Sequence, residues 1–120
     1  MFKAISSALA ATLVAGLFTS TAYAGAGHCA TGGKRSIHGD VPTRVRFKVV
    51  GENDETQAKI YWIDYNGRPK FYKHLFAGQS YTQQTYMTHP WLITYPAPGG
   101  GEDCGRVYMP RRSMRTVVIR

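Results

Sequence analysis

The sequence has little leucine, little cysteine and few acidic side chains, and each shortage excludes a class of protein. After residue 20 the only leucines are Leu75 and Leu92, and no later segment repeats apolar residues at helical spacing, which argues against a helical bundle. Two cysteines are too few for a disulfide-dense miniprotein or a four-thiolate metal site. With 43% hydrophobic and 18% charged residues in 120, the chain is neither a disordered polyelectrolyte nor a membrane bundle. A single small domain rich in β-strands remains.

The residue patterns that would carry enzymatic chemistry are also missing. The 7 acidic residues fall mostly in expected turns, and neither paired carboxylates nor a nucleophile with its base can be recognised. The four histidines, His28, His38, His74 and His89, do not have the spacing of a metal site. We therefore expect a protein that is not an enzyme and that uses no metal or cofactor.

The first 24 residues have the organisation of a secretory signal peptide. Lys3 gives a positive start, residues 8–18 form an uncharged apolar run, and Ala22-Tyr23-Ala24 supplies small residues before a cleavage point. The alternative, an N-terminal membrane anchor, is disfavoured because the run is too short to span a bilayer comfortably. We predict cleavage after Ala24, a flexible Gly-rich segment over 25–41, a β-domain over 42–120, a secreted or periplasmic location, and no transmembrane segment after cleavage.

The two cysteines, Cys29 and Cys104, are expected to form a disulfide because an exported protein matures in an oxidising compartment. Closing a loop of this length could stabilise the fold by about 4 kcal/mol, through restriction of the unfolded chain. The setting of Cys29, GAGHCATGG, is typical of a flexible tail, so the bond would hold a tail rather than a core. Neither cysteine lies in a recognisable nucleophile motif.

Alternating residues and turn signals divide the rest of the chain into short strands. Residues 44–50 (RVRFKVV) alternate with a basic outer face, and Asn66-Gly67 is a strong hairpin signal. Residues 96–103 are predicted to be a loop. Together the segments predict an all-β fold, a small antiparallel β-sandwich of about seven strands, with a small barrel as the alternative. The predicted strands are 44–50, 59–65, 69–72, 80–87, 91–95, 106–109 and 115–119.

Aromatic side chains are concentrated in one stretch of the sequence. Of the 12 aromatic residues after residue 24, 10 lie between Tyr61 and Tyr95. A core of this size needs fewer, and tyrosine hydroxyls must be hydrogen-bonded or left in water. Two interpretations stay open: a partly exposed aromatic surface that binds a ligand, or aromatic residues that replace missing leucine and isoleucine in the core.

The stretch over 62–91 resembles the β-domain of the von Hippel–Lindau tumour-suppressor family. The shared pattern is a tryptophan, a Gly-containing turn, Pro-x-x-Tyr, a second Gly turn, a hydroxyl residue and then His-x-Trp. A weaker likeness extends back to Pro42 and forward through residues 107–110. In this sequence the pattern consists of Trp62, Tyr72, Thr85, His89 and Trp91.

In that family the β-domain is a seven-stranded sandwich that binds an extended peptide containing 4-hydroxyproline. The resemblance implies that Trp62, Tyr72 and Trp91 form aromatic walls around the prolyl ring. It also implies that Thr85, where the family has serine, and His89 hydrogen-bond the prolyl hydroxyl. Such a site would reject unmodified proline, because its own polar groups would lack partners. Taken singly, each residue also fits an ordinary structural role; only the spaced set favours a pocket.

The chain departs from the family in several places. Gln84 stands where the family has a histidine, the stretch before Pro42 is not matched, and the loop over 51–57 is longer. The chain stops at Arg120 without the helical domain that recruits ubiquitin-ligase partners, so we expect no such partners. The implied function is a non-enzymatic, extracytoplasmic module that binds a peptide or protein containing proline or 4-hydroxyproline.

The proposed pocket depends on the register of the hairpin around Asn66-Gly67. A two-residue turn would pair Trp62 with Phe71 and put Tyr72 on the opposite face of the sheet. A three-residue loop over 66–68 would pair Trp62 with Tyr72 and put both rings on one face. The family resemblance requires the shared face, so we predict a bulged or longer loop, with Thr85 on the same face.

The basic excess leaves a second function open. The chain has a formal net charge of +8, and a basic β-sandwich could bind an envelope polyanion or serve a structural or interaction role. Nucleic acid is the less expected partner, because the charge is spread over several strands of an exported protein. The basic residues concerned are Arg44, Arg46, Lys48, Arg106, Arg111, Arg112, Arg115 and Arg120.

Overall fold

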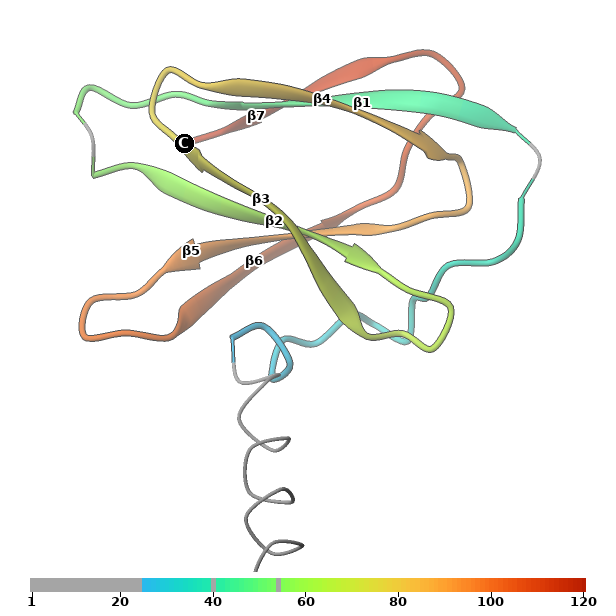
Figure 1. Cartoon of the computed structure of the whole chain (residues 1–120), viewed down its shortest axis with the longest axis horizontal. Coiled ribbons are helices and arrows are strands. Elements are labelled where there is room, and N and C mark those ends of the chain that lie inside the picture. Colours follow the sequence, from blue (N-terminus) through green and yellow to red (C-terminus); the bar gives the residue numbers. More distant parts are fainter. Residues whose placement is uncertain (1–24, 40, 54) are drawn as a thin grey trace, which may run out of the picture.

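The computed structural model describes residues 25–39, 41–53 and 55–120, and these form a sandwich of two β-sheets (Figure 1). One sheet has the strand order β4-β1-β7 and the other has the order β3-β2-β5-β6. This arrangement confirms the predicted all-β sandwich, while the predicted signal peptide over 1–24 lies outside the described residues. The strands are β1 (Pro42–Val49), β2 (Gln57–Ile63), β3 (Pro69–Phe76), β4 (Ser80–Tyr86), β5 (Trp91–Pro96), β6 (Glu102–Tyr108) and β7 (Arg115–Ile119).

The core lies between the two sheets and follows from the alternation of the strands. In β1 the side chains of Val45, Phe47 and Val49 are fully buried, whereas the basic residues between them are exposed. Because successive side chains of a strand point to opposite faces, the apolar set fills the interior and the charges stay in water. The buried residues that complete this core are Ala58, Ile60, Leu75, Trp91, Ile93, Val117 and Ile119.

Most strands begin or end one to four residues away from the predicted bounds, and three differences matter for the fold. The β1–β7 pair is parallel, and the other strand pairs are antiparallel. Strand β3 continues to Phe76 rather than residue 72, because it pairs with β2 over the whole length of β2. The predicted loop over 96–103 is shorter, since Pro96 pairs with Glu102 and both residues belong to strands.

The hairpin between β2 and β3 closes with a three-residue loop, one residue earlier than predicted. Asp64 is the reason: its carboxylate accepts hydrogen bonds from the backbone N–H groups of Asn66 and Arg68, each at 2.9 Å. The Asp64 carbonyl accepts the N–H of Gly67, which has a φ of 81° that suits glycine. The predicted pairing of Trp62 with Tyr72 is therefore wrong, and Trp62 pairs with Lys70.

The register nevertheless places Tyr72 on the face that the pocket requires, because Trp62 pairs with Lys70 and Tyr72 lies two residues further along β3. Ile60 pairs with Lys73 and Tyr61 pairs with Phe71, so Tyr72 is the extra, unpaired residue between them. The rings of Tyr72 and Trp62 are 6.4 Å apart between centroids, in an edge-to-face arrangement. The predicted shared face is thus achieved by the register of the three-residue loop, and the bulge lets Leu75 pair with Ala58 and enter the core.

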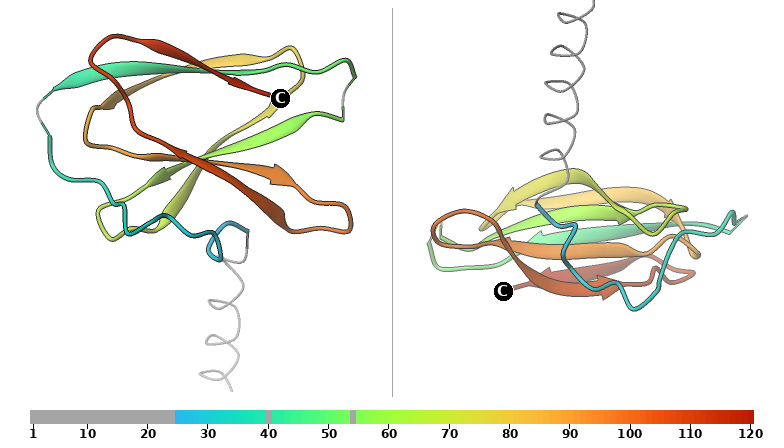
Figure 2. Two further views of the ribbon diagram at one scale, coloured as in Figure 1. Left: turned by 180° about the vertical axis from the view of Figure 1, so that it is seen from behind. Right: turned by 90° about the horizontal axis from the view of Figure 1, so that it is seen from below.

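Residues 25–39 run along the outer face of the β3-β2-β5-β6 sheet (Figure 2). Ala26 and Cys29 are buried there against Tyr61, Ile63 and Leu92, which form a second apolar cluster. The segment expected to be a flexible tail therefore has a packed conformation in the structure. Its mobility stays a prediction.

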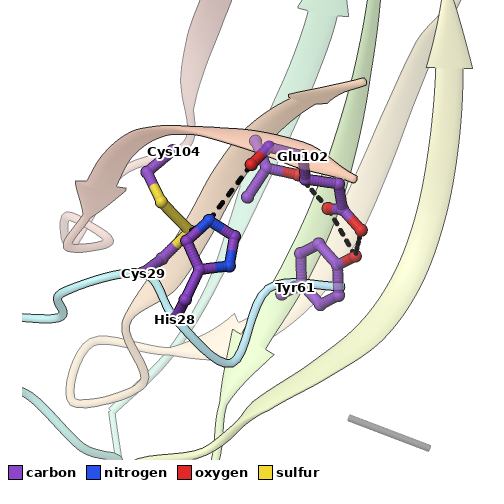
Figure 3. The surroundings of a disulfide bond; sticks show 6 residues. His28, Cys29, Tyr61, Glu102 and Cys104 are labelled. Atoms are coloured by element: carbon purple, nitrogen blue, oxygen red, sulfur yellow. Dashed lines mark hydrogen bonds between the residues drawn. A yellow bond between two sulfur atoms is a disulfide. The ribbon is translucent and has the colours of Figure 1, made fainter. Parts of the chain in front are cut away.

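The disulfide between Cys29 and Cys104 joins this segment to β6 (Figure 3). The two Cα atoms are 5.6 Å apart, a separation common for disulfides. A ring nitrogen of His28 lies 3.1 Å from the carbonyl oxygen of Glu102 and adds a second link to β6. The bond therefore holds a packed segment against the sheet instead of a loose tail.

Removing the disulfide is expected to lower the free energy of unfolding by about 3 to 4 kcal/mol, because the cross-linked cysteines are 75 residues apart. Urea unfolding of the Cys104→Ser variant against the oxidised protein measures this loss. The Cys29→Ser/Cys104→Ser double variant is the control and should match the single variant. Equal unfolding midpoints with and without reductant, or two reactive thiols in the non-reduced exported protein, would contradict this prediction.

Candidate functional site

The five residues of the family pattern line one cavity at an end of the sandwich. The connection from β4 to β5 crosses between the sheets at this end (Figure 1) and carries His89. The cavity has a volume of about 210 Å³ and receives side chains from both sheets. Its lining residues are Trp62, Tyr65, Tyr72, Gln83, Gln84, Thr85, Tyr86, His89 and Trp91.

Three aromatic rings form the apolar side of the cavity. Trp91 is 2% exposed and packs under Tyr72, with 5.0 Å between the ring centroids and an edge-to-face geometry. Tyr72 is 43% exposed and so forms the outer wall. Trp62 meets Tyr72 from the neighbouring strand, and Lys70 lies 5.9 Å above the Trp62 ring. The cavity therefore has a buried aromatic floor and accessible aromatic walls.

Trp62 is oriented by the segment that precedes β1. Its indole N–H donates to the Ser36 hydroxyl at 2.7 Å, and this hydroxyl donates to the carbonyl of Ile63 at 2.6 Å. The backbone N–H of Ser36 also donates to the carbonyl of Asp64. Ser36 is 3% exposed, so these bonds fix the indole plane from a position that water does not reach.

Thr85 occupies the opposite side of the cavity, on β4 of the other sheet. The indole N–H of Trp91 donates to the Thr85 hydroxyl oxygen across the two sheets, at 3.1 Å. A hydroxyl has one proton to donate and two lone pairs. Because Trp91 uses one lone pair, the hydroxyl proton of Thr85 and its second lone pair remain for a ligand.

His89 lies between the aromatic walls and the Thr85 side. Its Nε2 atom is 3.3 Å from the hydroxyl of Tyr65, and its ring lies 5.5 Å from the Trp62 ring. Burial, and then the nearby charge of His38, lower the pKa of His89 below its ordinary value. The ring is therefore neutral at pH 7, and one of its nitrogens is an acceptor.

The structure adds several residues to the cavity that the sequence did not predict as part of the site. Tyr65 stacks on His38, with ring centroids 4.2 Å apart, and contacts His89. Tyr86 and Gln83 complete the rim, as does Gln84 at the position of the family histidine. The only sequence signal for Tyr65 and Tyr86 is their membership of the aromatic-rich stretch, and Ser36 has none.

A second group of side chains with possible metal ligands lies on the outer face of the β3-β2-β5-β6 sheet. One ring nitrogen of His28 and the sulfur atoms of Cys29 and Cys104 lie within 4.8 Å of one another, as metal ligands would. The two sulfurs are bonded to each other, so neither is a thiolate that could bind a metal.

In the part of the chain that the structure describes, no helix has the length and apolar character needed to cross a bilayer.

Fold and cavity together define a β-sandwich binding module with an aromatic pocket and two buried polar groups, Thr85 and His89. The family model of the VHL beta domain matches residues 35–97, more than half of the chain. The chain belongs to the VHL beta-domain family, which confirms the resemblance and indicates a protein-binding module. The match begins before Pro42, so it includes Ser36, and it ends before the weaker likeness at 107–110. No curated protein matches the chain.

Acidification is expected to destabilise the fold through His89. The unfolded chain takes up this proton near pH 6.5, whereas the folded protein resists protonation because the pKa of buried His89 is lowered. The contribution of neutral His89 to the free energy of unfolding is complete above pH 6.5. It is lost progressively as the pH falls from 6.5 toward the lower pKa of His89 in the folded protein. Urea unfolding between pH 7.5 and 5 should show this slope, and His89→Gln should reduce it. An unchanged slope in His89→Gln, with His74→Gln as the matched control, would contradict the prediction.

Proposed function

We propose that this protein binds an extended peptide outside the cytoplasm and inserts a prolyl ring, preferably 4-hydroxyproline, into the cavity at the end of the sandwich. No catalytic step is part of this role. The observation that carries the proposal is the convergence of three aromatic and two polar side chains on one cavity of about 210 Å³. These side chains are Trp62, Tyr72, Thr85, His89 and Trp91.

The aromatic part of the cavity suits a proline ring. The faces and edges of Trp62, Tyr72 and Trp91 offer flat apolar surface from three directions. A pyrrolidine ring is compact and apolar, and its fixed φ lowers the ordering cost of the bound peptide. Tyr72 is the most exposed of the three rings, so the peptide would enter past it.

The polar part of the cavity suits a ligand hydroxyl. Thr85 keeps its proton for a ligand oxygen, because Trp91 already donates to the Thr85 oxygen. Neutral His89 offers a ring nitrogen that accepts the proton of the same ligand hydroxyl. Thr85 and His89 are 6% and 8% exposed, so an unmodified proline would displace water from them and leave the Thr85 hydroxyl proton and one His89 ring nitrogen unpaired.

A groove next to the cavity supports binding of the residues that flank the proline. This groove has a volume of about 540 Å³ and shares Gln84, Thr85 and Tyr86 with the cavity. It also receives Arg44 and Arg112, so its charge is positive. We therefore expect ligands with acidic or amide side chains beside the proline.

Matched peptides that differ only in the prolyl hydroxyl test the proposal. Titration with tryptophan fluorescence as the signal should give at least about tenfold tighter binding of the 4-hydroxyproline peptide, because burying unpaired polar groups costs about 1–3 kcal/mol. Thr85→Ala and His89→Ala should weaken binding of this peptide toward the affinity of the proline peptide. Trp62→Ala should weaken binding of both.

The matched controls are Thr82→Ala and His74→Ala, which change the same residue types on β4 and β3 outside the cavity. Both controls should bind both peptides as the unchanged protein does. Equal losses for the two peptides in Thr85→Ala and His89→Ala would remove hydroxyl recognition from the proposal. Absence of saturable binding of either peptide would overturn it.

Binding of an envelope polyanion is the second candidate function, and the outer face of the β4-β1-β7 sheet favours it. Arg44, Arg46 and Lys48 are exposed in one row along β1. The strands of this sheet carry no carboxylate, so nothing within them offsets the charge.

Salt dependence separates the two candidates. Binding of a polyphosphate chain should weaken steeply with salt concentration, and Arg46→Gln/Lys48→Gln should reduce the log–log slope by about 2. Binding of a 4-hydroxyproline peptide whose flanking residues are uncharged should change little over the same range of salt concentration. A polyphosphate slope that the double variant leaves unchanged would exclude this face as the binding surface.

A further inference from the structure

The outer face of the β3-β2-β5-β6 sheet contains a buried carboxylate that does not line the cavity. Glu102 is 8% exposed and accepts hydrogen bonds from the Tyr61 hydroxyl at 2.6 and 2.7 Å and from the Thr94 hydroxyl at 2.5 Å. Figure 3 shows Glu102 above Tyr61, beside the disulfide. Burial by itself raises the pKa of Glu102, but the two hydroxyl groups and Lys59 outweigh it and hold the pKa below its ordinary value. The carboxylate is therefore charged at neutral pH.

The negative charge of Glu102 is only weakly balanced by its ion pair. Among the described residues its ion-pair partner is Lys59, whose Nζ atom lies 3.6 Å from Oε2 and whose side chain is 29% exposed. Oε2 accepts from the Tyr61 hydroxyl but not from Thr94, and its contact with Lys59 is long, so a closer cationic donor can still bind it. A buried carboxylate with a single loose ion pair is costly, and a second cation would reduce that cost.

Gly25 lies against the oxygen with this spare capacity. A Cβ atom built on Gly25 would be 2.5 Å from Oε2 of Glu102 and 3.4 Å from the Tyr61 hydroxyl. Standard backbone dimensions then put the Cα atom within about 4 Å of Oε2 and the backbone nitrogen within about 5 Å. A residue with a side chain would have to displace the carboxylate from its present position.

The sequence independently predicts that Gly25 becomes the first residue of the exported protein. Ala22-Tyr23-Ala24 is a cleavage pattern for the endopeptidase that removes signal peptides. Hydrolysis of the peptide bond between Ala24 and Gly25 consumes one water molecule, leaves a carboxylate on Ala24 and leaves an amine on Gly25. This amine has an ordinary pKa of about 7.7–8.0 and is protonated at pH 7.

We propose that Glu102 is the binding site for the α-ammonium group of Gly25, which is created when the signal peptide is removed. The ammonium group supplies the second cation at Oε2 and joins residues 25–29 to β6 at a point next to the disulfide. The processed protein therefore has a contact that the unprocessed chain cannot make. This inference does not depend on the proposed peptide binding. It depends on the predicted cleavage after Ala24 and on the position of Gly25 beside Glu102.

The test compares two forms exported by the same cells from the full chain. One is the unchanged protein, and the other has two serines inserted between Ala24 and Gly25, so that its ammonium group is moved away. Intact-mass spectrometry identifies each N-terminus. At pH 7 the thermal midpoint of the form that begins at Gly25 should be higher by at least about 4 °C, the shift expected for roughly 1 kcal/mol in a domain of this size.

The same comparison in Glu102→Gln should show no difference between the two N-termini, because the amide carries no charge. Asp103→Asn, at the exposed neighbour of Glu102 in β6, is the matched control and should keep the difference. A processed N-terminus other than Gly25, equal midpoints in the unchanged background, or a difference that persists in Glu102→Gln would overturn the proposal.

A pH series on the two forms with Glu102 intact provides a measurement that needs no variant of the carboxylate. The ammonium group gains a partner on folding, so its stabilisation is complete below pH 7.7 and is lost as the pH rises through the higher folded pKa. The other titratable groups at this carboxylate, His28, Lys59 and Tyr61, are present in both forms, and their effects cancel in the difference. A difference in midpoint that stays constant up to pH 10 would assign it to the inserted residues and overturn the proposal.

Discussion

The indole of Trp91 lies between the two sheets, and its N–H group must find an acceptor there. Thr85 supplies that acceptor from the opposite sheet, at 3.1 Å. This bond connects β5 with β4 at the end of the sandwich where the cavity opens. It also determines the chemistry of the cavity, because it leaves the Thr85 proton available while the indole forms the floor. The packing of one tryptophan thus fixes both the sheet separation at this end and the orientation of a proposed ligand group.

The walls of the cavity depend on irregular features of β2 and β3. Asp64 sets the loop by bonding two backbone N–H groups, and the resulting register places Tyr72 on the same face of the sheet as Trp62. The bulge at Tyr72 shifts the pairing beyond it by one residue, so that Leu75 pairs with Ala58 and enters the core. Ser36 then holds the Trp62 indole from outside the sandwich. The cavity therefore depends on the segment before β1 as well as on the strands.

The β3-β2-β5-β6 sheet has different roles on its two faces. The inner face supplies Trp62 and Trp91 to the core and the cavity. The outer face carries the disulfide, the Glu102 network and the packed residues 25–39. Because side chains alternate between faces along each strand, changes at Glu102 and changes at the cavity should act independently. Stability and the proposed recognition of a peptide are in this way separated within one sheet.

The sequence by itself determined the all-β class and the pairing of the two cysteines, and its family resemblance named five residues that line one cavity. Period-two alternation, a cysteine count of two and the spacing of an aromatic pattern are local or one-dimensional signals, so they can be read without coordinates. It could not determine the parallel β1–β7 pair, the bulge at Tyr72 or the role of Ser36. Each of these depends on which residues meet in the folded chain. The partner of Trp62 also differs from the prediction by two residues, Lys70 instead of Tyr72, because the Asp64 carboxylate bonds the neighbouring backbone N–H groups. Tertiary structure decided them, because side-chain hydrogen bonds and sheet packing outweigh the turn preference of Asn66-Gly67.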